Sequence, residues 1–138
     1  MEDQELIRLV LDFAQKMNNL QLCYAALLYR KGADRADVLR RYREEADQVY
    51  ARRLTRRRRS CYYGVSYPPF FYGITGTAGV TVEHTEKRAV VTVLTDEGQL
   101  DFQFNLACSK GEWRIDSFKQ RYRGEDGFSP YQWQYGNF

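Results

Sequence analysis

The sequence concentrates its positive charge in one short run of six arginines: Arg52, Arg53, Arg56, Arg57, Arg58 and Arg59. The chain has a net charge of +3, so the part without this run sums to −3 and the basic character is local. Guanidinium groups bind carboxylates and phosphates through paired hydrogen bonds, so the run could form an anion-binding surface. The plainer interpretation is the solvated last turn of a helix, where positive charge complements the helix dipole.

Nucleic acid and an acidic protein are the two anionic partners that such a surface could bind. Contacts between arginine and phosphate supply most non-specific affinity for nucleic acid. The remainder of the chain is net acidic and contains no recognised nucleic-acid-reading module. We therefore expect an acidic protein as the partner of this surface, and no nucleic acid.

Aromatic residues crowd the C-terminal tail, where Tyr131, Trp133 and Tyr135 alternate with other residues. Tyrosine and tryptophan offer large contact areas at low entropic cost and are favoured at the centres of protein interfaces. Part of the tail could therefore bind a partner. The alternative is that the tail folds back and closes one end of the core.

Three residues could act as an acid or a base in an enzyme, but none has a clear catalytic context. His84 is the only histidine and falls in a predicted hairpin turn, where we expect it to be exposed. Asp12 lies on the polar stripe of a predicted helix, so we expect it to face away from a pocket. Asp116 is the best-placed carboxylate, yet a strand aspartate that bonds a neighbouring backbone or an arginine explains it equally well.

The sequence indicates no metal, cofactor or membrane site. Cys23, Cys61 and Cys108 are odd in number and lack a CxxC pair, which argues against a zinc site or a disulfide framework and favours the cytoplasm. The glycines at 73–79 lack the lysine and the helix start that phosphate binding needs. No apolar run approaches the ~20 residues that cross a bilayer. The acidic N-terminus differs from a secretory signal, so we expect the mature chain to begin where the sequence begins.

The clearest predicted element is a β-hairpin over residues 98–122. Its first strand alternates with the period of two that places one face on a core, the apolar positions being Leu100, Phe102, Phe104, Leu106 and Cys108. The segment Ser109–Gly111 supplies the turn. The apolar residues of the return strand change phase after Ile115, which predicts a β-bulge near Asp116 and Ser117.

Two amphipathic helices are predicted before this hairpin. The first ends near Lys31-Gly32, because apolar residues recur up to that point in steps of three and four: Leu6, Val10, Phe13, Met17, Leu20, Tyr24 and Leu27. Asn18-Asn19 could interrupt it. Asp34 is a suitable N-cap for the second helix, which we expect the arginine run to close. One stripe of this helix consists of Val38, Tyr42, Ala46, Val49 and Arg53, and Leu39, Tyr50 and Leu54 widen it.

The segment between the helices and the hairpin completes an α+β fold. The aromatic stretch around Pro68-Pro69 should cross the sheet as a loop or short edge strand and lay rings over it. Two strands follow, near 80–82 and 89–95, and the second is apolar in both phases, as a central strand covered on both faces would be. We expect one domain over residues 1–138, with the N-terminal helices packed on a curved antiparallel sheet of about four long strands.

Several segments, in this order along the chain, resemble immunity proteins with the nuclear transport factor 2-like fold. They are the arginine-rich helix end at 50–59, the Ser66–Pro69 segment, the strand Val91–Thr95 and the strand Gly111–Ser117, which reads GEWRIDS. The resemblance spans most of the chain from about Leu39 onward. The aromatic residues between Tyr67 and Gly76 and the long tail depart from the family pattern.

The resemblance implies a cone-shaped fold and a small bacterial protein that binds a cognate polymorphic toxin so that the producing cell is not poisoned. Such an antitoxin acts by stoichiometric binding and not as an enzyme, and our candidate contacts are the arginine run and the three aromatic residues of the tail. The alternative is a small-molecule enzyme or ligand-binding protein that uses the hollow of the sheet. That function requires a carboxylate base and a hydrogen-bond donor aimed into an apolar pocket. A monomer and a dimer both remain open.

Overall fold

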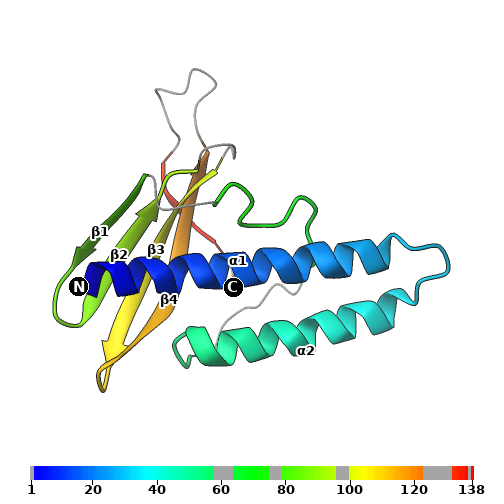
Figure 1. The fold of residues 1–138 in the computed structure, drawn as a ribbon, viewed down its shortest axis with the longest axis horizontal. Coiled ribbons are helices and arrows are strands. Elements are labelled where there is room, and N and C mark those ends of the chain that lie inside the picture. Colours follow the sequence, from blue (N-terminus) through cyan, green and yellow to red (C-terminus); the bar gives the residue numbers. More distant parts are fainter. Residues whose placement is uncertain (1, 58–63, 75–78, 96–99, 123–131, 137) are drawn as a thin grey trace.

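The structure is a computed structural model that describes residues 2–57, 64–74, 79–95, 100–122, 132–136 and 138. Its elements are, in chain order, α1 (Glu2–Leu28), α2 (Arg35–Arg53), β1 (Val80–His84), β2 (Arg88–Val93), β3 (Leu100–Ser109), β4 (Glu112–Tyr122) and β5 (Gln134–Tyr135). The strands form one antiparallel sheet in the order β1-β2-β3-β4-β5, with the helices packed against one face (Figure 1). This confirms the predicted α+β arrangement, with a short fifth strand beside four longer ones.

Helix α1 forms because its apolar side chains fall on one face. Five residues of the predicted stripe are buried, and the other two, Leu20 and Leu27, are half-buried. The buried five are Leu6, Val10, Phe13, Met17 and Tyr24. Ala14, Gln21 and Ala25, which the stripe did not include, are buried beside them. Asn18 and Asn19 do not interrupt the helix, which continues to Leu28. Gly32 lies in the following connection with a φ of 79°, a left-handed conformation that favours glycine.

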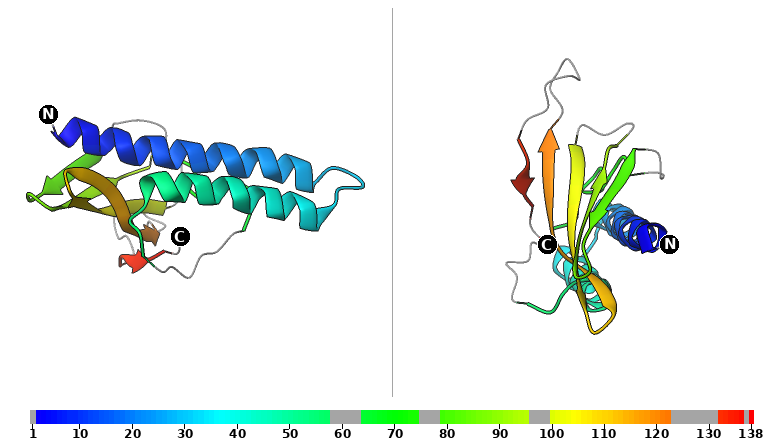
Figure 2. Two further views of the ribbon diagram at one scale, coloured as in Figure 1. Left: turned by 90° about the horizontal axis from the view of Figure 1, so that it is seen from below. Right: turned by 90° about the vertical axis from the view of Figure 1, so that its left-hand side faces the viewer.

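Helix α2 begins at the predicted cap. The amide of Asp37 donates to Asp34 Oδ1 over 3.2 Å, and the buried face consists of the predicted Val38, Tyr42, Ala46 and Val49. This face packs against α1 in a helical hairpin whose far end extends beyond the sheet (Figures 1 and 2). In the part of the chain that the structure describes, neither helix combines the length and apolar character needed to cross a bilayer.

The longest hairpin joins β3 to β4 and contains the predicted β-bulge. The pairing register shifts between Asn105 and Leu106, which leaves Asp116 as the extra residue on β4. Because of this shift, both Ile115 and Phe118 are fully buried although an odd number of positions separates them. The change of phase in the apolar pattern of β4 is therefore caused by a β-bulge, as the sequence predicted.

Strand β2 is central in the sheet but is covered on one face only. Ala89, Val91 and Val93 are buried, whereas Val90 and Thr92 are half-buried. The prediction of cover on both faces is wrong, because both helices lie on the same side of the sheet (Figure 2). The apolar residues in the second phase of β2 thus face the less covered side.

Phenylalanine rings from distant parts of the chain fill the space over the covered face of the sheet. Phe102 and Phe118 project from β3 and β4, and two residues of the loop after α2 pack on them. The ring centroid of Phe71 lies 5.2 Å from that of Phe102, and the centroid of Phe70 lies 5.6 Å from that of Phe118. The aromatic loop therefore lays its rings over the sheet, as the sequence predicted.

The C-terminal tail folds back on the same core. Strand β5 pairs with β4, and Phe138 is only 6% exposed. Its ring centroid lies 4.7 Å from that of Phe118 and 5.5 Å from that of Phe13. Gly136 crosses Phe118 so closely that an added Cβ would lie 2.1 Å from the ring. For residues 132–136 and 138, the tail thus closes the core, which was one of the two predicted alternatives.

Replacing Phe138 with alanine should lower the free energy of unfolding by about 3 to 5 kcal/mol, because the variant removes a buried ring from a packed cluster. Urea denaturation followed by circular dichroism measures this change. The control is Tyr29→Ala, which removes a ring that is 80% exposed and lies outside the tail. The control should change the free energy of unfolding by less than about 0.5 kcal/mol. Equal effects of the two variants would contradict the proposed docking of the tail.

Candidate functional site

Helix α2 ends within the arginine run, at Arg53, and the rest of the run is not helical as far as Arg57. Arg52 and Arg53 lie in the last helical turn, but Leu54 is extended, with φ −99° and ψ 154°, and pairs in parallel with Ile115 of β4. The Thr55 amide then donates to the Ile115 carbonyl over 2.9 Å. The prediction that the whole run closes the helix is wrong after Arg53, because pairing with the sheet replaces the next helical turn.

The arginines of the run differ in what they contact. Arg57 Nε lies 3.4 Å from Asp116 Oδ1, and Arg57 Nη2 donates to the Asp116 carbonyl over 3.0 Å. Arg52 and Arg56 are exposed and make no hydrogen bond or ion pair with another described residue. Two further members of the run lie outside the described residues: Arg58 and Arg59. Within the described part, Arg52 and Arg56 are thus the members best placed to meet a partner.

Asp116 holds the segment after α2 against the sheet. Its Oδ1 accepts a hydrogen bond of 2.6 Å from the Thr55 hydroxyl, and its Oδ2 lies 4.0 Å from Arg88 Nη1. Together with the contacts from Arg57, these bonds make the bulge residue an attachment point for segment 54–57. This geometry agrees with the structural interpretation of Asp116 and gives no support to a role as a catalytic base.

Arg114 is an important residue that the sequence did not single out. Its Nη1 donates to the carbonyl oxygens of Ala51 and Leu54 over 2.7 and 3.2 Å, and its Nη2 donates to Glu112 Oε1 over 2.9 Å. The last carbonyls of a helix lack intrahelical donors, so this guanidinium caps α2 from the sheet. In the sequence Arg114 is one more polar residue of a strand, and no local pattern distinguishes it from a solvated arginine.

A recess of about 480 Å³ opens beside this contact. Its lining contains three basic residues, Arg56, Lys110 and Arg114, and one acidic residue, Glu112. Because Arg114 and Glu112 pair with each other, Arg56 and Lys110 are the cations that keep their charge available within the described residues. The recess is therefore suited to a carboxylate or another small anion.

The tail makes two cation–π contacts along the second half of β4. The guanidinium carbon of Arg121 lies 4.2 Å from the ring centroid of Trp133, and Lys119 Nζ lies 4.8 Å from that of Tyr135. Arg121 is also paired with Asp101, with 3.4 Å between Nε and Oδ2. Trp133 is thus held against the sheet, whereas Tyr135 presents most of its ring to solvent. The remaining aromatic candidate lies outside the described residues: Tyr131.

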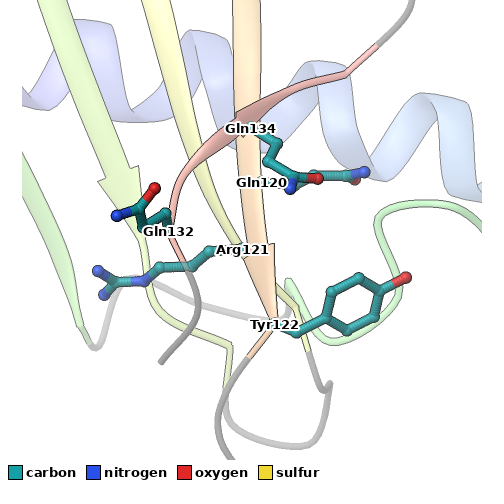
Figure 3. A pocket seen from close by; sticks show the side chains of 5 residues that line it. All are labelled: Gln120, Arg121, Tyr122, Gln132 and Gln134. Carbon is teal, nitrogen blue, oxygen red and sulfur yellow. The ribbon is translucent and has the colours of Figure 1, made fainter. Parts of the chain in front are cut away.

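A pocket of about 390 Å³ lies next to the tail (Figure 3). It is lined by Gln120, Arg121 and Tyr122 of β4 and by Gln132 and Gln134 of the tail. Arg121 and Gln132 project to one side of β4 and Tyr122 to the other. Amides donate and accept hydrogen bonds but do not act as proton donors at neutral pH, so this lining suits binding better than acid–base chemistry.

The two candidate regions of the sequence contact the same edge strand of the sheet, at separate points. Segment 54–57 contacts β4 at Ile115, and β5 pairs with it at Lys119 and Gln120. A strand rises about 3.3 Å per residue, so the two contacts lie within about 17 Å of each other along β4. We call this region the β4-edge surface and define it by four residues: Arg52, Arg56, Trp133 and Tyr135.

A groove of about 820 Å³ lies between α1 and residues 67–74. Asp12 is part of its lining, so the prediction that Asp12 faces away from a pocket is wrong. The periodicity of α1 could not reveal this groove, because its second wall is a loop whose position depends on tertiary contacts.

Comparison with known proteins identifies a protein family. The model of the family described as NTF2 fold immunity protein, where NTF2 stands for nuclear transport factor 2, matches residues 5–132. The match includes α1, which precedes the segments that carry the resemblance in the sequence. No curated protein and no solved structure matches the chain.

The variant Asp116→Ala should loosen segment 54–57 and lower the free energy of unfolding by about 1 to 3 kcal/mol, because Thr55 and Arg57 lose a charged hydrogen-bond partner. The amide of Thr55 should then exchange with solvent faster in hydrogen–deuterium exchange. Glu86→Ala removes an exposed carboxylate from the β1–β2 turn and should leave both quantities unchanged. Unaltered exchange at Thr55 in Asp116→Ala would show that the bulge does not hold the segment.

Proposed function

Since the chain belongs to the NTF2 fold immunity protein family, we propose that it neutralises a cognate bacterial toxin by binding it. The family match confirms the resemblance found in the sequence. The proposed partner is the toxic domain of a polymorphic toxin, and the inhibition is stoichiometric. In this proposal the protein acts in the bacterial cytoplasm and catalyses no reaction of its own.

The observation that carries the proposal is the filling of the covered face of the sheet by the chain's own rings. An enzyme or a small-ligand protein of this shape needs an apolar hollow with a carboxylate base and a donor aimed into it. Here the space is packed by a cluster of rings that includes Phe70, Phe71, Phe102, Phe118 and Phe138. The buried carboxylate of Asp101 accepts a hydrogen bond of 3.2 Å from the Thr95 amide and forms an ion pair with Arg121. These interactions stabilise the fold. These contacts favour a function on the outside of the molecule.

The β4-edge surface supports binding of an acidic face of the toxin. Arg52 and Arg56 carry charges that no described residue neutralises, and such charges accelerate association with an oppositely charged partner. Trp133 and Tyr135 add aromatic area of the kind that forms the centre of tight interfaces. An antitoxin must hold its toxin at about nanomolar affinity or better, and a mixed surface of arginine and aromatic side chains suits that requirement.

The first test is co-expression with the toxic C-terminal domain of a large protein encoded by the neighbouring gene. We expect the protein to restore growth of cells that make this domain and to form a complex of fixed stoichiometry with a dissociation constant of about 1 nM or lower. An unrelated protein expressed at the same level is the control. Poisoned cells that nevertheless accumulate the folded protein would overturn the proposal.

The double variant Arg52→Gln/Arg56→Gln should associate with the toxin about three- to tenfold more slowly at low ionic strength and should depend less on salt. Stopped-flow measurements over a salt series test this effect. The matched control is Arg30→Gln/Arg35→Gln, which removes the same charge at the opposite end of the helical hairpin. Equal slowing by both double variants would mean that net charge alone, and not the β4-edge surface, steers the toxin.

A further inference from the structure

The groove between α1 and residues 67–74 has a wall that α1 holds in place through its own side chains. Asn18 Nδ2 donates to the Phe71 carbonyl over 3.1 Å, and the Phe71 amide donates back to Asn18 Oδ1 over 3.0 Å. Gln21, about one turn further along α1, accepts a hydrogen bond from the Phe70 amide. The rings of Phe70 and Phe71 are anchored in the core beneath. The wall is therefore already ordered before a partner arrives, which lowers the entropic cost of binding.

Apolar side chains on the groove remain open to solvent. Tyr67 is 70% exposed, Tyr72 is 49% exposed and Leu22 is 46% exposed, and all three line the groove. They are three of the seven large apolar side chains that are exposed in the described part of the chain. Their concentration around one groove, in place of single scattered positions, is typical of an interaction site.

The charge of the groove indicates the chemistry of its occupant. Asp12 is the single charged residue in the lining, and it makes no hydrogen bond or ion pair with another described residue. The amides of Gln15 and Asn19 lie in the same lining. A groove whose lining contains a carboxylate and two tyrosine rings offers a cation both direct attraction and cation–π contact. An anionic occupant would find no compensating positive charge in this lining.

We propose that this groove binds a segment of the toxin in which an arginine or lysine side chain stands beside apolar residues. The cation pairs with Asp12, and the apolar residues pack against Leu22 and Tyr72. This inference rests on the proposed function, because it takes the toxin as the partner. It adds a contact of opposite charge to the one expected at the β4-edge surface, so the toxin presents both an acidic face and a basic segment.

The experiment measures the affinity of the purified toxin domain for groove variants by biolayer interferometry. Asp12→Lys and Tyr72→Ser should each weaken binding by about tenfold or more, and Tyr72→Ser chiefly by faster dissociation. Two matched controls make the same kinds of change at exposed positions outside the groove: Glu5→Lys and Tyr29→Ser. The controls should bind within about twofold of the wild type, the range expected for residues outside an interface. Thermal unfolding of each variant verifies that it is folded.

The outcomes separate this inference from the function on which it rests. Wild-type binding together with unchanged affinity in both groove variants overturns the groove and leaves the proposed function intact. Equal weakening by variants and controls also overturns it, because the effect would then not be local to the groove. Failure of the wild type to bind or neutralise the toxin overturns the proposed function and this inference with it. Restored binding of Asp12→Lys by a toxin variant with a lysine or arginine changed to glutamate would identify the paired cation.

Discussion

The packing of rings around Phe118 connects the sheet with the loop at residues 64–74 and with the C-terminal tail. The centroid of this fully buried ring lies 5.5 Å from that of Phe71, 5.6 Å from that of Phe70 and 4.7 Å from that of Phe138. Loop 64–74 has no strand pairing to hold it, so it is fixed by burial of its rings, worth roughly 2 to 3 kcal/mol for each, together with the hydrogen bonds that Asn18 and Gln21 make to its backbone. The outer wall of the groove and the course of the tail along β4 therefore depend on the same cluster. Phe118 thus supports both the groove wall and the tail, although its own ring is buried in the core.

The bulge on β4 joins this core to the arginine segment. Without the extra residue, Ile115 and Phe118 would lie on opposite faces of the sheet, and one of them would leave the core. The bulge also frees Asp116 from the regular ladder, so its carboxylate can reach Thr55 and Arg57. One irregularity in the strand therefore serves both the packing of the sheet and the attachment of the segment after α2. This explains why a phase change in an apolar pattern coincides with the best-placed carboxylate in the sequence.

Features that depend on near neighbours could be predicted from the sequence, and features that depend on distant contacts could not. The helical stripes, the cap at Asp34 and the bulge each follow from spacing within a few residues. The end of α2 does not, because the arginine run is compatible with a longer helix and only the pairing of Leu54 with β4 stops it. Asp101 stood in the polar phase of its strand yet is buried, since Arg121 and the Thr95 amide compensate its charge. The candidate contact residues could be proposed from the sequence, but their placement along one edge strand and the groove beside Asp12 could not.

The covered edge of β4 limits how a partner can be recognised there. The free N–H and C=O groups of an edge strand usually invite another strand, which is a common mode of peptide binding. On β4 the Ile115 carbonyl is taken by Thr55, and the tail pairs at Lys119 and Gln120. A partner at these positions must therefore be recognised by side chains, such as the guanidinium groups and the tail rings, and not by addition of a strand. Side chains on a short segment and a tail can change without disturbing the ring cluster beneath them, so the same core can present different surfaces to different partners.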